Sequence, residues 1–458
     1  MPSHFAHHGS AVSRRQLLRI GGMGLAGLNL ATLFRAKSLS AEAPAGRPQT
    51  IKSCILLFYY GGPSHLDMWD QKPDAPREVR GDFGSISTSV PGRSISEQMP
   101  HTARVMDRVG LIRSMHHPMR NHNSAAVEAL CGRTPIGGDL ELLANNSATD
   151  FPCYGSALNY MLPNPGKVPP HVALPHVMYN VVMLPGQTAG FLGSAYEPWQ
   201  VTRDPNTPDF RISELELPGK LGLAGLEDRK TLLNIVDRQF ASQGKLAETA
   251  EMGDYYQQAF SLLSSTAVRE AFDISKEDDK TRERYGRTTH GQSVLLARRL
   301  AESGVRMVCV YDHVRNGLDN WDTHVDNFGR LKNSLLPPTD RAFAALIEDL
   351  TERGQLDSTL VISIGEFGRT PMINTSGGRD HWPDCFSVAL AGGGVHGGTT
   401  YGTSDKIGAY PETDPVTPGD LAATIYWRFG LDHTHELHDG TGRPQRLAAG
   451  EPLRALFG

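Results

Sequence analysis

The sequence predicts an α/β protein, a sandwich of helices around a mostly parallel sheet, and two observations lead to this fold class. Short continuous apolar runs, such as residues 54–60 and 306–311, are typical of strands that are buried on both faces of a parallel sheet. Segments with helical periodicity lie between these runs along the chain. Strands that alternate with helices in this way indicate an α/β sandwich.

The expected elements follow one another from residue 54 to residue 429. Gly61-Gly62-Pro63 ends the first strand, and Asn123 or Ser124 is a candidate cap for a helix that ends before Gly132. We predict helices at 97–106, 123–130, 226–240, 254–263, 292–303, 339–353 and 418–429, and strands at 54–60, 109–113, 306–311, 358–364 and 387–391.

The composition excludes several classes of protein. Hydrophobic residues make up 39% and charged residues 21% of the 458 residues, which is typical of a globular protein and not of a disordered chain or a coiled coil. The 45 Lys and Arg are outnumbered by 50 Asp and Glu, which argues against binding to nucleic acid. Five cysteines are too few for a disulfide scaffold, and we expect Cys54 and Cys309, inside predicted strands, to be free thiols.

Residues 1–43 are predicted to be an export signal. Arg14 and Arg15 precede an uncharged apolar run, residues 20–34, which is shorter than the ~20 residues of a membrane-spanning helix. This pattern is that of a bacterial twin-arginine signal, and residues 41–43 supply a small-x-small cleavage site. We therefore expect the twin-arginine export machinery as a partner, a periplasmic or secreted product and no stable membrane span. The alternative is an amphipathic N-terminal helix that stays attached.

Residues 44–458 are predicted to form a single domain. Residues 151–226 are rich in proline and glycine and have weak periodicity, so we predict a loop-rich insertion with short strands there. The chain shows no internal repeat and no low-complexity tract.

Metal-ligand residue types gather after four predicted strand ends or the loops that follow them. In open α/β sheets, ligands bind beyond the carboxyl ends of the strands. Carboxylate and imidazole groups are ligands of zinc and manganese, whereas magnesium and calcium prefer oxygen ligands. We predict one or two divalent metal ions (zinc, manganese, magnesium or calcium), with these candidate ligands: Asp67, Asp322, His324, Glu366, Asp380, His381 and, as a lesser candidate, His65.

Each of these groups also has a structural explanation. An Asp after a strand is commonly a helix cap, Glu366 could pair with Arg369 as a salt bridge, and His381 could pack beside Trp382. His324 is either a metal ligand or a partner of neighbouring carboxylates. Both interpretations stay open at the level of the sequence.

Residues 120–124 precede a predicted helix and supply candidate catalytic groups. The Ser124 hydroxyl, at a helix N-terminus near metals, could act as the nucleophile; the alternative is that it only caps the helix. His122 is a candidate ligand or general acid, and Arg369 would bind charged oxygens bidentately.

Six segments of the chain carry a family resemblance: the twin-arginine leader, Gly61 to Pro73, Gly190-Phe191-Leu192-Gly193, Trp321 to His324, Gly365 to Pro371 and Gly378 to Trp382. Together these motifs resemble a secreted bacterial family named domain of unknown function 1501. The family is grouped with the alkaline-phosphatase-like superfamily, which includes sulfatases and cofactor-independent phosphoglycerate mutases. The resemblance implies a three-layer α/β/α sandwich, divalent metals at strand ends and a nucleophilic Ser, Thr or formylglycine.

The chain departs from the active members of that superfamily at two points. Their Asp-His pair corresponds here to Glu366-Phe367, so one imidazole is missing. The segment Cys131-Gly132-Arg133-Thr134-Pro135 does not fit the sulfatase motif, in which Cys or Ser is followed by x-Pro-x-Arg. A formylglycine nucleophile is therefore not predicted.

Two hypotheses about function follow. The first is an exported metal-dependent hydrolase of phosphate or sulfate esters that acts on a small-molecule or polysaccharide substrate. The second is a non-catalytic relative that binds sugar or protein partners at the cell surface. The carboxylate and histidine clusters favour the first hypothesis, whereas the missing imidazole and nucleophile motif favour the second.

The export signal gives a direct prediction. Changing Arg14 and Arg15 to lysine should block export, because the signal depends on the paired guanidinium groups. Cell fractionation and immunoblotting should then find the precursor inside the cytoplasm. Normal accumulation of the double variant outside the cytoplasm would contradict the prediction, and Arg19→Lys serves as the matched control.

Overall fold

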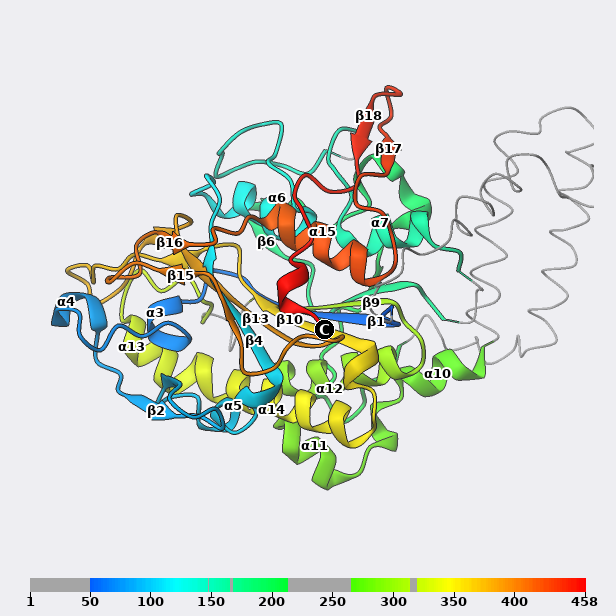
Figure 1. Cartoon of the computed structure of the whole chain (residues 1–458). Helices are drawn as coiled ribbons and strands as arrows, with labels where there is room; N and C mark the ends of the chain where they lie inside the picture. Colours follow the sequence, from blue (N-terminus) through cyan, green and yellow to red (C-terminus); the bar gives the residue numbers. More distant parts are fainter. Residues whose placement is uncertain (1–49, 147, 165–167, 213–264, 314–318) are drawn as a thin grey trace, which may run out of the picture. The chain divides into compact units, whose positions relative to one another are not determined.

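The computed structural model of the chain describes residues 50–146, 148–164, 168–212, 265–313 and 319–458 (Figure 1). Residues from Gln49 onward group into one compact unit. The predicted export signal and the predicted helices at 226–240 and 254–263 lie outside the described residues. Within the described ranges, none of the helices is long and apolar enough to span a membrane.

An eight-stranded sheet forms the middle of the described unit, in the order β14-β4-β13-β10-β1-β9-β5-β8. Strand β1 (Ser53–Tyr59) pairs in parallel with β10 (Thr359–Ile364) on one side and with β9 (Met307–Asp312) on the other. Strand β13 (Phe386–Gly392) is antiparallel to its neighbours β10 and β4 (Val109–Met115). The predicted mostly parallel α/β sheet is confirmed.

Residues 151–212 contain short strands, as expected from the sequence, and two of these strands belong to the central sheet. Strand β5 (His171–Leu174) pairs in parallel with β9, and β8 (Trp199–Gln200) extends the sheet beyond it. Helix α7 (Tyr154–Met161) packs close to β5 and β9. These strands are short and flanked by proline and glycine, so their periodicity is too weak to separate them from loops. At the other edge, β14 (Thr400–Tyr401) pairs in parallel with β4.

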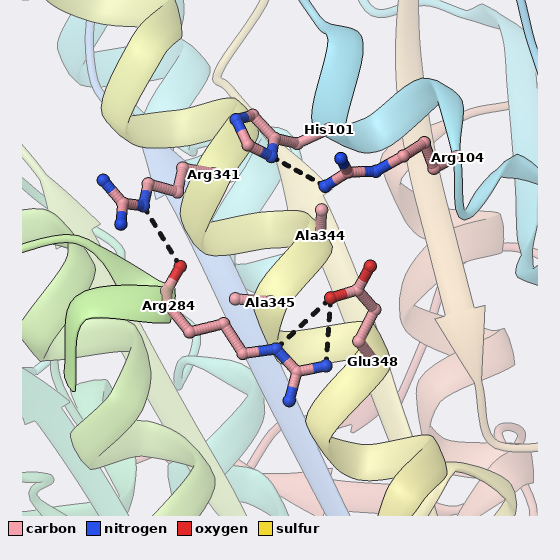
Figure 2. Close-up of a pocket in the computed structure, with 7 residues that line it drawn as sticks. All are labelled: His101, Arg104, Arg284, Arg341, Ala344, Ala345 and Glu348. Atoms are coloured by element: carbon pink, nitrogen blue, oxygen red, sulfur yellow. Dashed lines mark hydrogen bonds and ion pairs between the residues drawn. The ribbon is translucent and has the colours of Figure 1, made fainter. Parts of the chain in front are cut away.

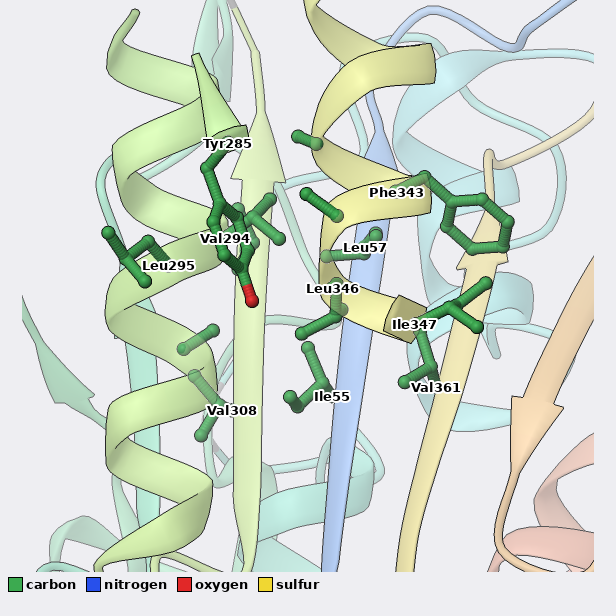
Figure 3. Packing of buried hydrophobic residues seen from close by; sticks show 14 of the residues in the cluster. Ile55, Leu57, Tyr285, Val294, Leu295, Val308, Phe343, Leu346, Ile347 and Val361 are labelled. Carbon is green, nitrogen blue, oxygen red and sulfur yellow. The ribbon is translucent and has the colours of Figure 1, made fainter. Parts of the chain in front are cut away.

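Alternate residues of β1 face opposite layers of helices, as the two-residue period of a strand requires. Ile55 and Leu57 are fully buried against the layer that contains α12 (Thr289–Glu302) and α14 (Leu336–Glu352). Figure 3 shows both side chains pointing toward these two helices. One face of the sheet is therefore covered by long amphipathic helices.

The opposite face is covered by a second layer. Leu56 and Phe58 pack in a separate core with residues of α6 (His122–Cys131), α7 and α15 (Pro418–Arg428). Figure 1 shows α6, α7 and α15 on one side of the sheet and α5, α11, α12 and α14 on the other. The three-layer α/β/α sandwich implied by the resemblance is thus present.

The predicted helix at 97–106 is shorter in the structure. Only α5 (Pro100–Ala103) and a 3₁₀ turn at Met106–Arg108 form there, with Pro100 at the first helical position. The remaining short elements are α3 (His65–Met68), α4 (Arg77–Arg80), α10 (Thr266–Phe272), α11 (Asp279–Tyr285), α13 (Asn327–Arg330), β2 (Ser85–Ser87), β3 (Ser94–Ser96), β6 (Tyr179–Asn180), β7 (Val182–Met183), β11 (Gly368–Arg369), β12 (His381–Trp382), β15 (Thr403–Ser404), β16 (Pro411–Thr413), β17 (Glu436–His438) and β18 (Pro444–Arg446).

All five cysteines are buried free thiols, as predicted for Cys54 and Cys309. Cys309 and Cys153 flank the buried ring of His171, with Sγ atoms 3.5 Å from Nε2 and 4.0 Å from Nδ1 respectively. Burial raises the pKa of the Cys153 thiol to about 11 and lowers the pKa of His171 to about 3. His171 is therefore a neutral core residue at physiological pH.

The buried His171 predicts part of the acid sensitivity of the fold. Its folded pKa of about 3 lies below its unfolded pKa of about 6.5, so the unfolded chain binds the proton first as the pH falls. His171 leaves stability unchanged above about pH 6.5 and lowers the free energy of unfolding progressively from there down to about pH 3. The slope is up to ~1.4 kcal/mol per pH unit.

Urea unfolding of His171→Phe at pH 7 and pH 4.5 tests this prediction. Between pH 7 and pH 4.5, the free energy of unfolding should fall in both proteins. The fall should be about 2 kcal/mol smaller in the variant than in the natural protein. The exposed His438 supplies the matched control, His438→Phe, which should keep the natural acid slope. Equal slopes for the natural protein and His171→Phe would contradict the prediction.

Candidate metal and catalytic centre

Side chains from four parts of the chain converge beyond the carboxyl ends of β9 and β10. Asp322 and His324 come from the segment after β9, and Glu366 follows β10. His381 is the first residue of β12, and His122 is the first residue of α6. The structure therefore brings these five predicted site residues together at the edge where α/β proteins bind ligands.

Two glycines permit this close approach of backbone segments. Gly61, at the end of β1, has φ 115° and lies against the backbone of Trp321 and Asp322. A Cβ atom at Gly378 would collide with the backbone of His324, so a glycine there lets the loop before β12 approach Asp322 and His324.

Three ligand atoms form a nearly equilateral triangle. His324 Nε2 lies 3.0 Å from Asp322 Oδ1 and 3.0 Å from His381 Nε2, and His381 Nε2 lies 3.2 Å from Asp322 Oδ1. Ligand atoms around a tetrahedral ion with bonds of about 2.0–2.2 Å are separated by roughly 3.3–3.6 Å. The triangle is therefore close to the spacing of three ligands on one metal ion.

His122 and Glu366 extend this triangle on its buried side. His122 Nδ1 lies 2.7 Å from Glu366 Oε1, and its Nε2 lies 3.4 Å from Asp322 Oδ2. The ligand atoms of His122, Asp322 and His381 all lie within 4.8 Å of one another. His122, at the start of α6, thus links the carboxylates of Glu366 and Asp322.

The Glu366 carboxylate provides a test of whether a cation fits this centre. Its Oε1 accepts a hydrogen bond of 2.8 Å from the Gly61 N–H, while its Oε2 is buried and has no hydrogen-bond partner in the described part of the chain. A buried carboxylate oxygen without a partner is costly. A metal ion held by oxygen and imidazole ligands would provide that partner, so the residues present fit such a group.

The charges of the centre shift the pKa values of its members. Burial alone would lower the pKa of His122, but its hydrogen bonds to Asp322 and Glu366 outweigh burial and raise it to about 9. Burial alone would raise the pKa of Asp322, but hydrogen bonds from His122, His324 and His381 hold it far below its usual range. The contact between His122 and Asp322 therefore favours the charged form of both groups.

His324 lies between two carboxylates. Its Nδ1 is 2.6 Å from Asp380 Oδ1, and its hydrogen bond to Asp322 is the main reason that its pKa is raised. The hydrogen bond between His324 Nδ1 and Asp380 lowers the pKa of the exposed Asp380 carboxyl. In contrast, burial lowers the pKa of His381. Asp380 thus orients His324, as a carboxylate behind a metal-binding imidazole commonly does.

Arg369 is fully buried, and its contacts correct the prediction that it binds substrate oxygens. Its Nε and Nη1 donate to the carbonyls of Gly62 and Arg379, both at 3.0 Å, and its Nη2 donates to the Gly61 carbonyl and to Asp322 Oδ1 at 2.6 Å. Because Nε, Nη1 and Nη2 each donate to a protein oxygen, no adjacent pair of N–H groups remains for bidentate binding. Arg369 positions Asp322 instead.

Ser124 is neither the N-cap of α6 nor a member of the cluster. The N-cap is Asn121, and the fully buried Ser124 hydroxyl donates to Asp139 Oδ1 at 2.6 Å. Asp139 also accepts hydrogen bonds from the backbone N–H groups of Arg120 and Asn121. A hydroxyl in this buried position has no path to a substrate, so the structure does not support Ser124 as the nucleophile.

Asp67 and His65 lie on α3, and their contacts place neither of them in the cluster. Both oxygens of Asp67 are held by Arg379, with Nε–Oδ2 of 2.8 Å and Nη2–Oδ1 of 3.0 Å. Asp67 also accepts hydrogen bonds from Ser64 and Asn327, and His65 Nε2 lies 2.8 Å from the Gly408 carbonyl. This correction reflects burial, because an acid at this depth needs a paired cation.

Comparisons with known proteins identify the family of this chain. The family model described as "Protein of unknown function (DUF1501)" matches residues 51–457. The chain belongs to this family. No curated protein matches the chain.

Solved structures similar to this DUF1501 protein include three bacterial proteins. The sulfatase PsFucS1 from Pseudoalteromonas sp. is 14% identical, with a TM-score of 0.37 over 87% of this chain and 70% of that one. An alkaline phosphatase superfamily protein from Vibrio parahaemolyticus is 11% identical, with a TM-score of 0.35 over 87% and 74%. The phosphonate monoester hydrolase SpPMH from Silicibacter pomeroyi is 11% identical, with a TM-score of 0.28 over 90% and 76%.

Sequence reasoning missed two residues that shape the centre of this DUF1501 protein. The ring of Tyr60 lies 5.1 Å from that of His122 and 4.7 Å from that of His313, measured between centroids. Tyr60 is the last residue of the first predicted strand. Its position at the carboxyl end of that strand is the signal that could have placed it at the site. The ion pair between Arg379 and Asp67 could not be predicted, because nothing in the sequence connects these two residues.

The buried Asp67–Arg379 pair gives a stability prediction for this DUF1501 protein. Arg379→Gln should lower the free energy of unfolding by about 3–5 kcal/mol, because it leaves the Asp67 charge buried without its cation. Arg203 forms an exposed ion pair with Asp209, so Arg203→Gln is the control and should cost less than about 1 kcal/mol. Denaturant unfolding measures both, and equal losses would contradict the prediction.

Proposed function

We propose that this protein is a metal-dependent hydrolase of phosphate or sulfate esters. The observation that supports the proposal most directly is the triangle formed by Asp322, His324 and His381, beside the unpartnered buried oxygen of Glu366. One or two divalent ions held there would supply Lewis-acid chemistry toward an ester oxygen. The two imidazoles favour zinc or manganese over magnesium and calcium, which prefer oxygen ligands only.

The residues of this centre have different proposed roles. Asp322, His324, His381 and Glu366 are the proposed ligands, and Asp380 orients His324 through its Nδ1. Both ring nitrogens of His122 face carboxylate oxygens, which only accept hydrogen bonds, so both nitrogens carry hydrogen. Because both nitrogens are occupied in this way, we assign to His122 the positioning of Glu366 and Asp322 rather than proton transfer to the leaving alcohol.

Water is the proposed attacking group. The hydroxyls next to the cluster in sequence donate elsewhere: Ser124 to Asp139, Thr323 to Asn327 and Thr370 to the carbonyl of Met372. In the proposed reaction the oxygen of water joins the phosphorus or sulfur, and the bond from that atom to the alcohol oxygen breaks. One of the two protons of water ends on the alcohol oxygen, and the other stays on the released phosphate or passes, with sulfate, to the solvent.

The substrate class and the location complete the proposal. We propose a small-molecule or polysaccharide ester as the substrate. Export by the twin-arginine machinery to the periplasm or the medium is proposed from residues 1–43 alone.

A second candidate function is a non-catalytic relative that binds sugar or protein partners. One observation favours it: the Arg369 guanidinium, 2.6 Å from Asp322 Oδ1, already supplies a positive charge to the central carboxylate. The cluster could then be stable as an internal network of ion pairs. Metal content separates this candidate from the hydrolase.

Metal analysis and ester hydrolysis test the proposal together. The protein, reconstituted with zinc or manganese, should retain about one equivalent or more and hydrolyse p-nitrophenyl phosphate or p-nitrophenyl sulfate. His324→Ala should lose retained metal and lower the hydrolysis rate at least about a hundredfold, because it removes a proposed ligand. His324 is only half-buried, so this variant should stay folded and soluble.

His438→Ala is the matched control, since His438 is exposed on β17 and should change neither metal content nor rate. Retention of less than about a tenth of an equivalent by the natural protein would contradict the hydrolase and favour the second candidate. Full metal content in His324→Ala would remove His324 from the site.

A further inference from the structure

A depression of about 410 Å³ lies on the outer side of α14, where this helix meets α5 and α11. Ala344 and Ala345 contribute the small side chains of its lining on α14, and longer side chains from the three elements surround them (Figure 2). None of the residues that line the depression belongs to the candidate metal centre. Its volume is within the range of pockets that bind small ligands.

The lining is unusually basic for this chain, whose formal net charge is −5. Three arginines line it, Arg104, Arg284 and Arg341, with Glu348 as its single carboxylate. Glu348 is occupied by Arg284, whose Nη2 lies 3.0 Å from its Oε2. Arg284 also binds Glu352, with two N–O distances of 2.7 Å, so its charge is neutralised within the protein.

The other two guanidinium groups have no carboxylate partner in the described ranges. Arg341 donates from Nε to the Arg284 carbonyl at 3.3 Å and from Nη2 to the Glu283 carbonyl. Arg104, which is exposed, donates from Nη2 to His101 Nδ1 at 2.9 Å. Carbonyl and imidazole acceptors hold these side chains in place without neutralising them. The depression therefore keeps two uncompensated positive charges.

We propose that this depression, which Arg104 and Arg341 line, binds a tetrahedral oxyanion, a phosphate or sulfate group. The planar guanidinium group has several N–H donors in fixed directions, which suit the oxygens of such anions. The backbone and imidazole contacts hold the two side chains before a ligand arrives, which lowers the entropic cost of binding. The same anion can be free in solution or the charged end of an ester. The proposal does not depend on the hydrolase function.

Isothermal titration at low ionic strength tests this site. The probes are inorganic phosphate, inorganic sulfate, glucose 6-phosphate and glucose 6-sulfate, with chloride as the background anion. The natural protein should bind at least one probe saturably, and the double variant Arg104→Gln/Arg341→Gln should weaken that binding at least about tenfold, because both charged donors are lost. Tighter binding of the esters would identify an esterified group as the ligand, and equal or tighter binding of the inorganic anions a free one; both support the shared chemistry.

Two controls separate this site from general effects of charge and from the metal centre. Arg287, paired with Asp279 and Glu283, is not part of the lining, so Arg287→Gln should leave binding unchanged. Binding should also persist in Asp322→Asn, which disables the metal centre. If the double variant is unstable, Arg104→Gln alone, at an exposed side chain, should still weaken binding measurably.

The proposal is overturned if no probe binds above the chloride background. It is also overturned if the Arg104 and Arg341 variants bind as tightly as the natural protein, or if Asp322→Asn abolishes binding.

Discussion

The buried guanidinium group of Arg369 is the contact on which the arrangement of the centre depends. It donates to the carbonyls of Gly61 and Gly62 after β1, to the carbonyl of Arg379 before β12, and to the carboxylate of Asp322 after β9. Three separate segments therefore share one hydrogen-bonding group. A lysine could not replace it, because a single ammonium group cannot donate in so many fixed directions.

Charge explains why the histidines gather where they do. Asp322, Glu366 and Asp380 lie within one small region, and carboxylates repel one another unless cations or hydrogen-bond donors lie between them. His122 links Asp322 with Glu366, and His324 links Asp322 with Asp380. Even so, one oxygen of Glu366 stays buried without a partner in the described residues. A metal ion would be the positive partner that this buried oxygen lacks, which is why the electrostatics of the fold support the proposed metal site.

The depression on α14 differs from this centre in the origin of its charge. At the centre, buried acids attract imidazoles and a guanidinium group, so every strong charge has an opposite charge close by. On α14, Glu348 and Glu352 both form ion pairs with Arg284. Arg104 and Arg341 are then held by neutral acceptors and keep their charge available. A chain with a net negative charge thus presents a local positive surface far better suited to anions than its composition suggests.

The sequence by itself determined the α/β class, five of the eight strands of the central sheet and the five converging groups, Asp322, His324, Glu366, His381 and His122, because apolar runs and the residues after them are local signals. It could not decide strand order, the antiparallel direction of β13, or the role of residues 151–212 in the sheet. The sequence also suggested Asp67 as a metal ligand and Arg369 as a binder of substrate oxygens, although both are buried ion-pair partners in the fold. Only the tertiary structure decided these points, since burial and pairing depend on residues far apart in the chain, such as Asp67 and Arg379, which are 312 positions apart.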